Sequence, residues 1–346
     1  MNESQQNDSR YPYKYAWDYL RGICEGNVSR SDVAKMMQFV GQLLGIDHEE
    51  LAIKIADYAQ ANPHDAQVLL DNALRRINKQ DITGTTIPIQ SIPEVITIEL
   101  PGGVGLEMVS IPKGSFLMGS PEGELDRSSD EGPQHQVTIA PFLMGKYPVT
   151  QAQWRAVASL PEVEREVDAD PSDFKNDKCP VEQVSWHEAL EFCARLSKLT
   201  GKPYTLPSEA QWEYACRAST TTPFYFGETI TTDLANYDGD YSYGSGSTGV
   251  YRAELTEVGS FPPNAFGLYD MHGNVVEWCL DVWHGSYDRA PVDGTAWMTG
   301  GASEVRVHRG GAWDDEPKYC RSAYRSSDWS NAREAFNGFR IVSLLN

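Results

Sequence analysis

Cysteine is scarce and irregularly spaced in this chain. The 346 residues include six cysteines, and no two of them form a CxxC motif. They are Cys24, Cys179, Cys193, Cys216, Cys279 and Cys320. Residues 1–10 are polar and lack the apolar core of a secretory signal, so we expect a cytoplasmic chain whose cysteines are free thiols. The composition argues against a secreted domain held together by disulfides.

Positive charge is also scarce. The chain has 29 lysines and arginines against 49 aspartates and glutamates, which gives a net charge of −20. Such a chain is poorly suited to neutralising phosphate groups, so nucleic acid and anionic membranes are excluded as expected partners. No apolar run reaches the roughly 18 residues that a membrane-spanning helix needs, and we expect no membrane insertion.

The negative charge is unevenly distributed. The net charge is −3 over residues 1–90, −18 over residues 91–303 and +1 over residues 304–346. The acidic loop 121–131 shows no repeated ligand spacing and is expected to be solvated. The near-neutral C-terminal stretch stands out from the acidic body that precedes it.

Residues 1–80 are predicted to form a small helical module. Apolar side chains recur there at three- and four-residue spacing in four segments: 17–23, 33–44, 48–59 and 64–77. Residues 81–94 contain glycine, proline and threonine without helical period and are predicted to be a linker. We expect the helical module to bind another protein or to self-associate.

Residues 95–346 have the pattern of an α+β domain. Short apolar runs alternate with turn residues, and Val95–Leu100 alternates as a strand that ends at Pro-Gly-Gly. Three stretches have helical spacing instead, at 150–157, 185–199 and 208–216. Each begins with serine or threonine, and glutamate or glutamine follows three residues later in the last two, as in a capping box.

Seven motifs within this domain appear in the order known from one family. They are MVSIPKGSFLMGS (108–120), PFLMGKYPVTQAQW (141–154), CPVEQVSWHEALEFC (179–193), LPSEAQWEYACRA (206–218), FPPNAFGLYDMHGNVVEWCLD (261–281), RGGAW (309–313) and GFR (338–340). The chain resembles the formylglycine-generating, or sulfatase-modifying, domain over about residues 95–343. The resemblance implies a variant of the C-type lectin fold.

The catalytic positions of that family are changed in this sequence. The enzymes of the family hold Cu(I) with two cysteines and use a serine nearby. The corresponding positions are Ala312, Asp315 and Cys320. Since a carboxylate cannot replace a soft thiolate as a ligand of Cu(I), we expect no copper and no oxidase activity. Cys320 is then interpreted as a small buried apolar residue.

The segment LYDMHGNVVEW is a candidate structural calcium site. Asp270 and Glu277 offer hard oxygen ligands seven residues apart, around a turn. The resemblance adds the backbone carbonyls of Gly273 and Val275 to this site. A second family site near Asn236 has no clear partner residue, and its existence stays open.

The C-terminal segment 312–337 has the composition of a binding surface. Rigid aromatic residues alternate there with small polar and charged ones, as in antibody paratopes. Trp313 follows Gly-Gly-Ala directly and is expected to belong to the core. Trp329 and Phe336 are surrounded by polar neighbours and are harder to place there.

The same segment resembles the variable region of the proteins diversified by retroelements. In that class a fixed frame of RGGxW, CRSAxR and GFR surrounds rewritten codons, and aspartate, tyrosine and serine are expected products of altered asparagine codons. The frame appears at 309–313, 320–325 and 338–340. The candidate variable residues are Asp314, Asp315, Glu316, Lys318, Tyr319, Tyr324, Ser326, Ser327, Asp328, Trp329, Ser330, Glu334, Phe336 and Asn337.

The sequence therefore predicts a non-catalytic protein that binds a protein ligand through its C-terminal segment. Tyr319, Tyr324, Trp329 and Phe336 would anchor the ligand, while charged neighbours select it. The change in net charge near residue 304 is interpreted as the boundary between scaffold and variable surface. The alternative is a formylglycine-generating or related oxidase that uses Cys320.

Overall fold

The computed structural model describes residues 95–344. The described residues belong to one compact unit of the chain, Pro93–Asn346. The predicted helical module, residues 1–80, and the predicted linker, residues 81–94, lie outside the described residues.

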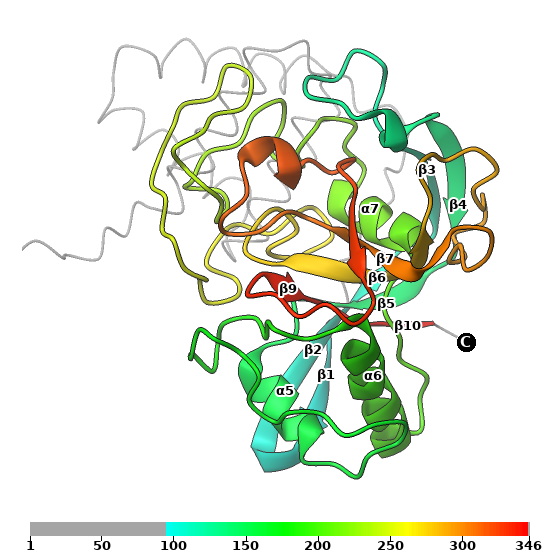
Figure 1. Ribbon diagram of the computed structural model, residues 1–346, viewed down its shortest axis with the longest axis vertical. Helices are drawn as coiled ribbons and strands as arrows, with labels where there is room; N and C mark the ends of the chain where they lie inside the picture. The colour runs from blue at the N-terminus through cyan, green and yellow to red at the C-terminus, as the bar shows by residue number, and fades with distance from the viewer. Residues whose placement is uncertain (1–94, 345–346) are drawn as a thin grey trace, which may run out of the picture. The chain divides into compact units, whose positions relative to one another are not determined.

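The described residues form three small sheets linked by long irregular segments (Figure 1). The first sheet has the order β1-β2-β5-β10, the second pairs β3 with β4, and the third has the order β8-β7-β6-β9. Neighbouring strands are antiparallel except for β6 and β9, which are parallel. The strands are β1 (Val95–Leu100), β2 (Val104–Ile111), β3 (Gly114–Met118), β4 (His135–Ile139), β5 (Phe142–Gly145), β6 (Val276–Trp283), β7 (Ala302–Arg309), β8 (Ser326–Trp329), β9 (Asn337–Gly338) and β10 (Val342–Leu344).

The three predicted helices are confirmed, each within one residue at both ends. They are α5 (Gln151–Ala158), α6 (Trp186–Thr200) and α7 (Glu209–Arg217), and each begins with a capping box. Short 3-10 turns occur at η1 (Pro101–Gly103), η2 (Ser129–Glu131) and η3 (Pro317–Cys320). In the described part of the chain, no helix has the length and apolar character needed to span a membrane. The domain is thus a mixed α and β fold with few helices, as predicted.

Strand β6 separates two hydrophobic cores. Its Trp278 belongs to the core that contains Trp154 and Phe192 from α5 and α6. The next residue, Cys279, belongs to the core that contains Trp212 from α7. Successive side chains of a strand point to opposite faces, so β6 contributes to both cores. In Figure 1, α5 and α6 lie beside β1 and β2, and α7 lies next to β6 and β7.

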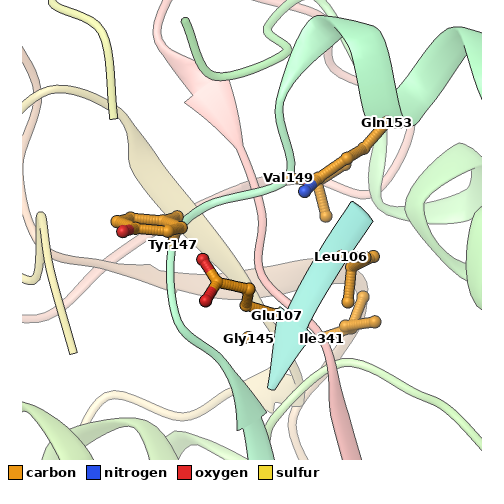
Figure 2. A pocket seen from close by; sticks show the side chains of 7 residues that line it. All are labelled: Leu106, Glu107, Gly145, Tyr147, Val149, Gln153 and Ile341. Carbon is orange, nitrogen blue, oxygen red and sulfur yellow. The ribbon is translucent and has the colours of Figure 1, made fainter. Parts of the chain in front are cut away.

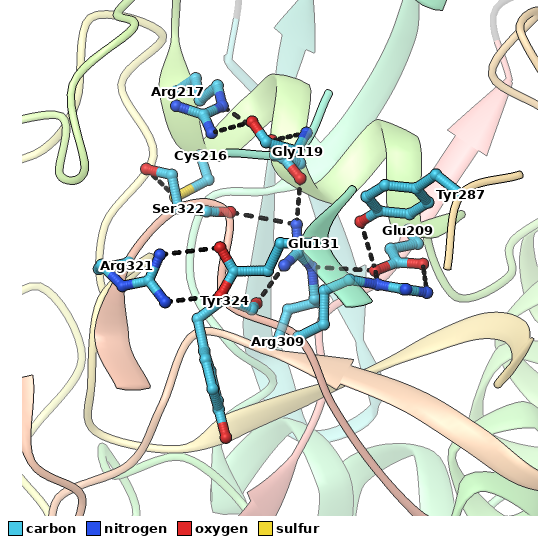
Figure 3. Close-up of polar contacts among 12 residues, drawn as sticks. Gly119, Glu131, Glu209, Cys216, Arg217, Tyr287, Arg309, Arg321, Ser322 and Tyr324 are labelled. Carbon is cyan, nitrogen blue, oxygen red and sulfur yellow. Dashed lines mark hydrogen bonds and ion pairs between the residues drawn. The ribbon is translucent and has the colours of Figure 1, made fainter. Parts of the chain in front are cut away.

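Buried ion pairs connect the C-terminal segment to the rest of the domain (Figure 3). Four arginines between residues 309 and 340 each bind a buried glutamate: Arg309 pairs with Glu213, Arg321 with Glu131, Arg325 with Glu209 and Arg340 with Glu277. No side chain in these pairs is more than 4% exposed. The frame residues between the candidate variable positions therefore lie inside the molecule.

The acidic loop 121–131 supplies part of this network. Arg321 donates to both carboxylate oxygens of Glu131, at 2.6 and 2.9 Å, and to Glu124 at 2.6 Å. Burial opposes ionisation of Glu131, but the arginine outweighs it and lowers the pKa of that carboxyl below its usual value. The prediction that this loop is solvated is wrong for Glu124 and Glu131, because an arginine about 190 residues later in the chain withdraws them from water.

The Arg321 pair can be tested through stability. Arg321→Met leaves two carboxylates buried without a cation, so the free energy of unfolding should fall by about 3–5 kcal/mol. Urea unfolding followed by circular dichroism measures this change. Lys175→Met is the matched control, because Lys175 and its partner Asp170 are 55% and 49% exposed. That substitution should cost less than about 1 kcal/mol. Equal losses in the two variants would contradict the role of the buried pair.

Candidate ligand-binding surface

The segment 312–337 is held at both ends by the third sheet. β7 pairs with β6 before the segment begins, and β9 pairs with β6 where it ends. In between, the chain forms η3 and then β8, which returns to pair with β7. Figure 1 shows this path in orange and red, over the edge of the sheet. The segment is therefore a long excursion that starts after β7 and finishes at β9, the two strands that flank β6.

Most of the candidate variable residues reach the surface. Asp314, Trp329 and Glu334 are exposed, and the side chain of Trp329 is 62% exposed. The half-buried candidates are Asp315, Glu316, Lys318, Tyr319, Tyr324, Ser326, Ser327, Asp328 and Phe336. Twelve of the fourteen predicted residues are thus at least partly accessible to a partner.

Ser330 and Asn337 are exceptions and correct the prediction. Both are buried. The Ser330 hydroxyl lies 3.1 Å from Nε2 of His187 on α6, and Asn337 forms β9 by pairing with Val276. These two residues hold the segment against the domain, so they do not belong to its contact surface.

The predicted anchors do not form a single cluster. The rings of Tyr319 and Tyr324 pack against each other with centroids 5.0 Å apart, and the Lys318 ammonium lies 4.7 Å from the centre of the Tyr319 ring. Trp329 instead ends β8, where it pairs with Val305. The two tyrosines near η3 and the tryptophan on β8 would therefore contact a ligand at different places on this surface.

Cys320 lies in an apolar environment. Its side chain is completely buried and packs with Phe224 and Tyr243. Burial, reinforced by the negative charge of Asp315, raises the pKa of the thiol well above its usual value. A protonated thiol is a poor nucleophile and a poor metal ligand. The residue is a small buried apolar group, as predicted.

The backbone around Cys320 is fixed by two close contacts. Gly311 has φ of 71°, and a Cβ there would lie 2.6 Å from the Cys320 sulfur, so only glycine fits. Nδ1 of His272 lies 2.7 Å from the Cys320 carbonyl, and Nε2 accepts from the Tyr225 N–H. Burial lowers the pKa of His272 to about 3, so the ring is neutral, and Nδ1 carries the proton that it donates to the carbonyl.

The other two catalytic positions of the family are occupied differently. Ala312 is buried, and its N–H donates to Oδ2 of Asp315 over 2.9 Å. Burial, together with the charge of Asp314, raises the pKa of Asp315 to about 6. These residues form a turn stabilised by a hydrogen bond between side chain and backbone, and they contribute no thiol.

Glu277, one of the predicted calcium ligands, is paired with an arginine. Both carboxylate oxygens of Glu277 accept from Arg340 at 2.6 Å, and one of them also accepts from Trp212 Nε1 at 2.8 Å. The cation that neutralises Glu277 is thus the guanidinium of Arg340. The described residues contain no group of three or more His, Cys, Asp or Glu side chains that could hold a metal ion.

Asp270 is the other carboxylate of the predicted site. One of its oxygens accepts from the Gly259 N–H, and the second is buried without a partner among the described residues. Burial raises the pKa of Asp270 to about 6. Gly273 and Val275 are linked by a backbone hydrogen bond, which occupies the Gly273 carbonyl. The segment is a turn whose donors and acceptors are mostly used internally.

A loop that sequence reasoning did not assign lies against the C-terminal segment. The Asp238 N–H donates to the Asp315 carbonyl, and the Tyr251 ring is nearly parallel to that of Trp313. Trp313 is only half-buried, whereas the sequence predicts it in the core. The residues 237–252 are rich in tyrosine, serine, glycine and aspartate, which is the same paratope-like composition. This composition is the sequence feature from which the loop could have been predicted to form part of the binding surface.

A small pocket lies away from this surface, between β2 and the segment 145–153 (Figure 2). Its volume of about 10 Å³ has room for about one water molecule. Glu107, on its wall, forms an ion pair with Lys146 at 3.2 Å. The pocket is too small for an organic substrate.

The assignment of Glu277 to Arg340 leads to a prediction about calcium. A chelator should leave the melting temperature of the protein unchanged, as measured by differential scanning calorimetry. Glu277→Gln should lower the melting temperature equally with calcium and with chelator, because the lost partner is an arginine. A chelator-induced fall that calcium reverses would contradict this assignment.

Known proteins share this architecture. Residues 102–345 match the sulfatase-modifying factor enzyme 1-like domain family. The structure of PvdO from Pseudomonas aeruginosa is 37% identical, with a TM-score of 0.63, over 73% of this chain and 99% of that one. Variable protein 1 of Treponema denticola is 24% identical, with a TM-score of 0.55, over 73% of this chain and 100% of that one.

A curated relative contains the domain as part of a longer chain. Serine/threonine-protein kinase pkn1 of Chlamydia caviae is 30% identical over 68% of this chain, but the match covers only 38% of the kinase. The family match extends over well more than half of the present sequence. This chain belongs to the sulfatase-modifying factor enzyme 1-like domain family.

Proposed function

We propose that this protein is a non-catalytic binding protein that contacts a protein ligand through the segment 312–337. The contrast within the segment carries the proposal. The frame arginines Arg321 and Arg325 are buried in ion pairs. Candidate variable residues on either side of them, such as Asp314 and Trp329, are exposed. An exposed residue can be exchanged without disturbing the buried pairs, which is what a diversified surface requires.

The proposed scaffold is the C-type lectin variant of this family, and the proposed origin of the surface is a diversity-generating retroelement. The fold is shared with a Treponema denticola protein whose title calls it a variable protein. At 24% identity this likeness concerns the fold alone. The proposal for diversification rests on the frame motifs at 309–313, 320–325 and 338–340 of this chain.

The absence of catalysis is part of the proposal. The positions expected to carry the catalytic serine and first cysteine hold Ala312 and Asp315, and the remaining Cys320 is buried and protonated. A single inaccessible thiol offers no site for Cu(I), so no copper is expected. An oxidase of the formylglycine-generating type is the second candidate, which the family membership and the retained Cys320 favour.

The compartment and the N-terminal partner are also proposals. The five cysteines of the described residues are free and buried, which is consistent with a reducing, cytoplasmic environment. We propose that residues 1–80 bind another protein or self-associate, and that the negative net charge excludes nucleic acid as a partner.

An activity assay separates the two candidates. The protein, incubated with Cu(I), oxygen and a cysteine-containing sulfatase peptide, should form no aldehyde by mass spectrometry. A known formylglycine-generating enzyme in the same buffer provides the positive control. Turnover by this protein that disappears in Cys320→Ala would overturn the binding proposal in favour of the oxidase.

Sequencing the DNA around the gene tests diversification. We expect a near-copy of the coding segment for residues 306–340 that differs from it mainly at adenines, beside a reverse-transcriptase gene. The differences should fall in codons of the exposed candidates, such as Asp314 and Trp329, and spare those of Arg321 and Arg325. A neighbourhood without such a copy would refute the retroelement origin.

A further inference from the structure

Three aromatic rings form a column at one edge of the C-terminal segment. Trp313 lies nearly parallel to Tyr251, with ring centroids 6.3 Å apart and an interplanar angle of 11°. Phe174 meets Trp313 edge to face at 5.5 Å. Tyr251 is 36% exposed, and the other two rings are half-buried. The column therefore presents aromatic surface to solvent.

The backbone and the indole nitrogen fix Trp313 in place. Its N–H donates to the Asn274 carbonyl at 3.1 Å, and its indole N–H donates to the Ala335 carbonyl at 3.4 Å. The ring also joins the small core cluster of Cys179 and Val275. A ring that is held before a ligand arrives loses little conformational entropy on binding.

Carboxylates surround the exposed end of the column. The Gly249 N–H donates to the Gly239 carbonyl at 2.7 Å, which brings Asp238 and Asp240 beside the segment that carries Tyr251. The Asp238 N–H also donates to the carbonyl of Asp315, the residue after Asp314. Desolvation and then the negative charges of these three aspartates raise the pKa of Tyr251. The pKa of Asp314 is raised by burial and by Asp238. None of these three aspartates takes part in an ion pair within residues 95–344.

A fourth acidic group lies behind the column. Glu182 is completely buried, and one of its carboxylate oxygens accepts from the Phe174 N–H at 3.0 Å. Its other oxygen has no partner among the described residues. Unlike the glutamates that are buried against arginines, Glu182 has no counter-ion among the described residues, and burial raises its pKa to about 7.

We propose that the Trp313 surface, formed by Tyr251, Trp313, Phe174 and the carboxylates of Asp238, Asp240 and Asp314, binds an arginine side chain of the protein ligand. This inference rests on the proposed function and adds the chemistry of the partner. The guanidinium lies over the aromatic column, and the aspartates accept its N–H groups. The ligand accordingly presents a basic segment to this edge.

The chemistry of the surface selects this occupant. The face of an aromatic ring carries negative electrostatic potential and attracts cations, and a guanidinium stacks on it well because it is planar and weakly hydrated. Unmatched aspartates repel each other, and a cation between them relieves that repulsion. A carboxylate or phosphate group would meet only negative charge here. A hard metal ion gains little from aromatic rings, since it prefers oxygen ligands.

The test uses the full chain and a short synthetic peptide with two arginines, compared with the same peptide carrying citrulline at both positions. Citrulline keeps the shape of arginine but has no charge. Isothermal titration calorimetry should show that the arginine peptide binds at least about tenfold more tightly and weakens as salt is raised, because the attraction is electrostatic. Equal affinities would overturn the proposal.

Two variants locate the binding. Tyr251→Ala and Asp314→Asn should each weaken arginine-peptide binding by about three- to fivefold, as expected for loss of one exposed cation–π or ionic contact. Asp288→Asn is the matched control, because Asp288 is exposed and lies in the loop between β6 and β7. Unchanged affinity in Tyr251→Ala and Asp314→Asn, or displacement of the peptide by calcium, would refute the site.

The outcome is separable from that of the proposed function. Failure of the arginine peptide to bind removes this inference and leaves the binding role of segment 312–337 as it stands. Aldehyde formation from a cysteine peptide would remove the binding role itself. Circular dichroism of each variant confirms that a loss of affinity does not come from unfolding.

Discussion

The need to neutralise buried charge determines how the C-terminal third of this domain folds. Burying an arginine without a carboxylate partner strongly destabilises the folded state. Each frame arginine can therefore be buried only at a position where it pairs with a glutamate. Arg309 and Arg325 find theirs on α7, Arg321 finds its partner in the loop 121–131, and Arg340 finds Glu277 on β6. These pairs join segments that are 63 to 190 residues apart. The path of segment 312–337 follows from these attachment points.

The same pairs explain the uneven charge along the sequence and change its interpretation. The near-neutral stretch 304–346 and the acidic body before it are not separate electrostatic regions, because arginines of the first neutralise glutamates inside the second. The predicted boundary between scaffold and variable surface is therefore not a boundary in charge. Near Tyr251, negative charge comes from both regions: from Asp314 in the stretch 304–346 and from Asp238 and Asp240 in the acidic body.

Local chemistry was predictable and long-range chemistry was not. The bounds of α6 and α7 were predicted to within one residue. Their capping boxes begin at Ser185 and Ser208, and each box spans only four consecutive residues, so it can be recognised in the sequence. The ion pair of Glu277 with Arg340 was not predicted, because Arg340 lies 63 residues away and no spacing rule connects the two. The contact between Tyr251 and Trp313 was missed for the same reason, although both segments have the composition of binding loops.

The return of the chain to β6 has a consequence for how this surface can evolve. β9 lies parallel to β6 at Val276 and Glu277, and Gly338 lies so close to the Val181 carbonyl and the Val275 side chain that a Cβ there would be within 2.9 Å of each. An inserted or deleted residue before this point would shift Arg340 away from Glu277. Point substitution keeps the register of both strands. Lineages of this protein should therefore differ in the identity of the residues along this excursion and preserve its length.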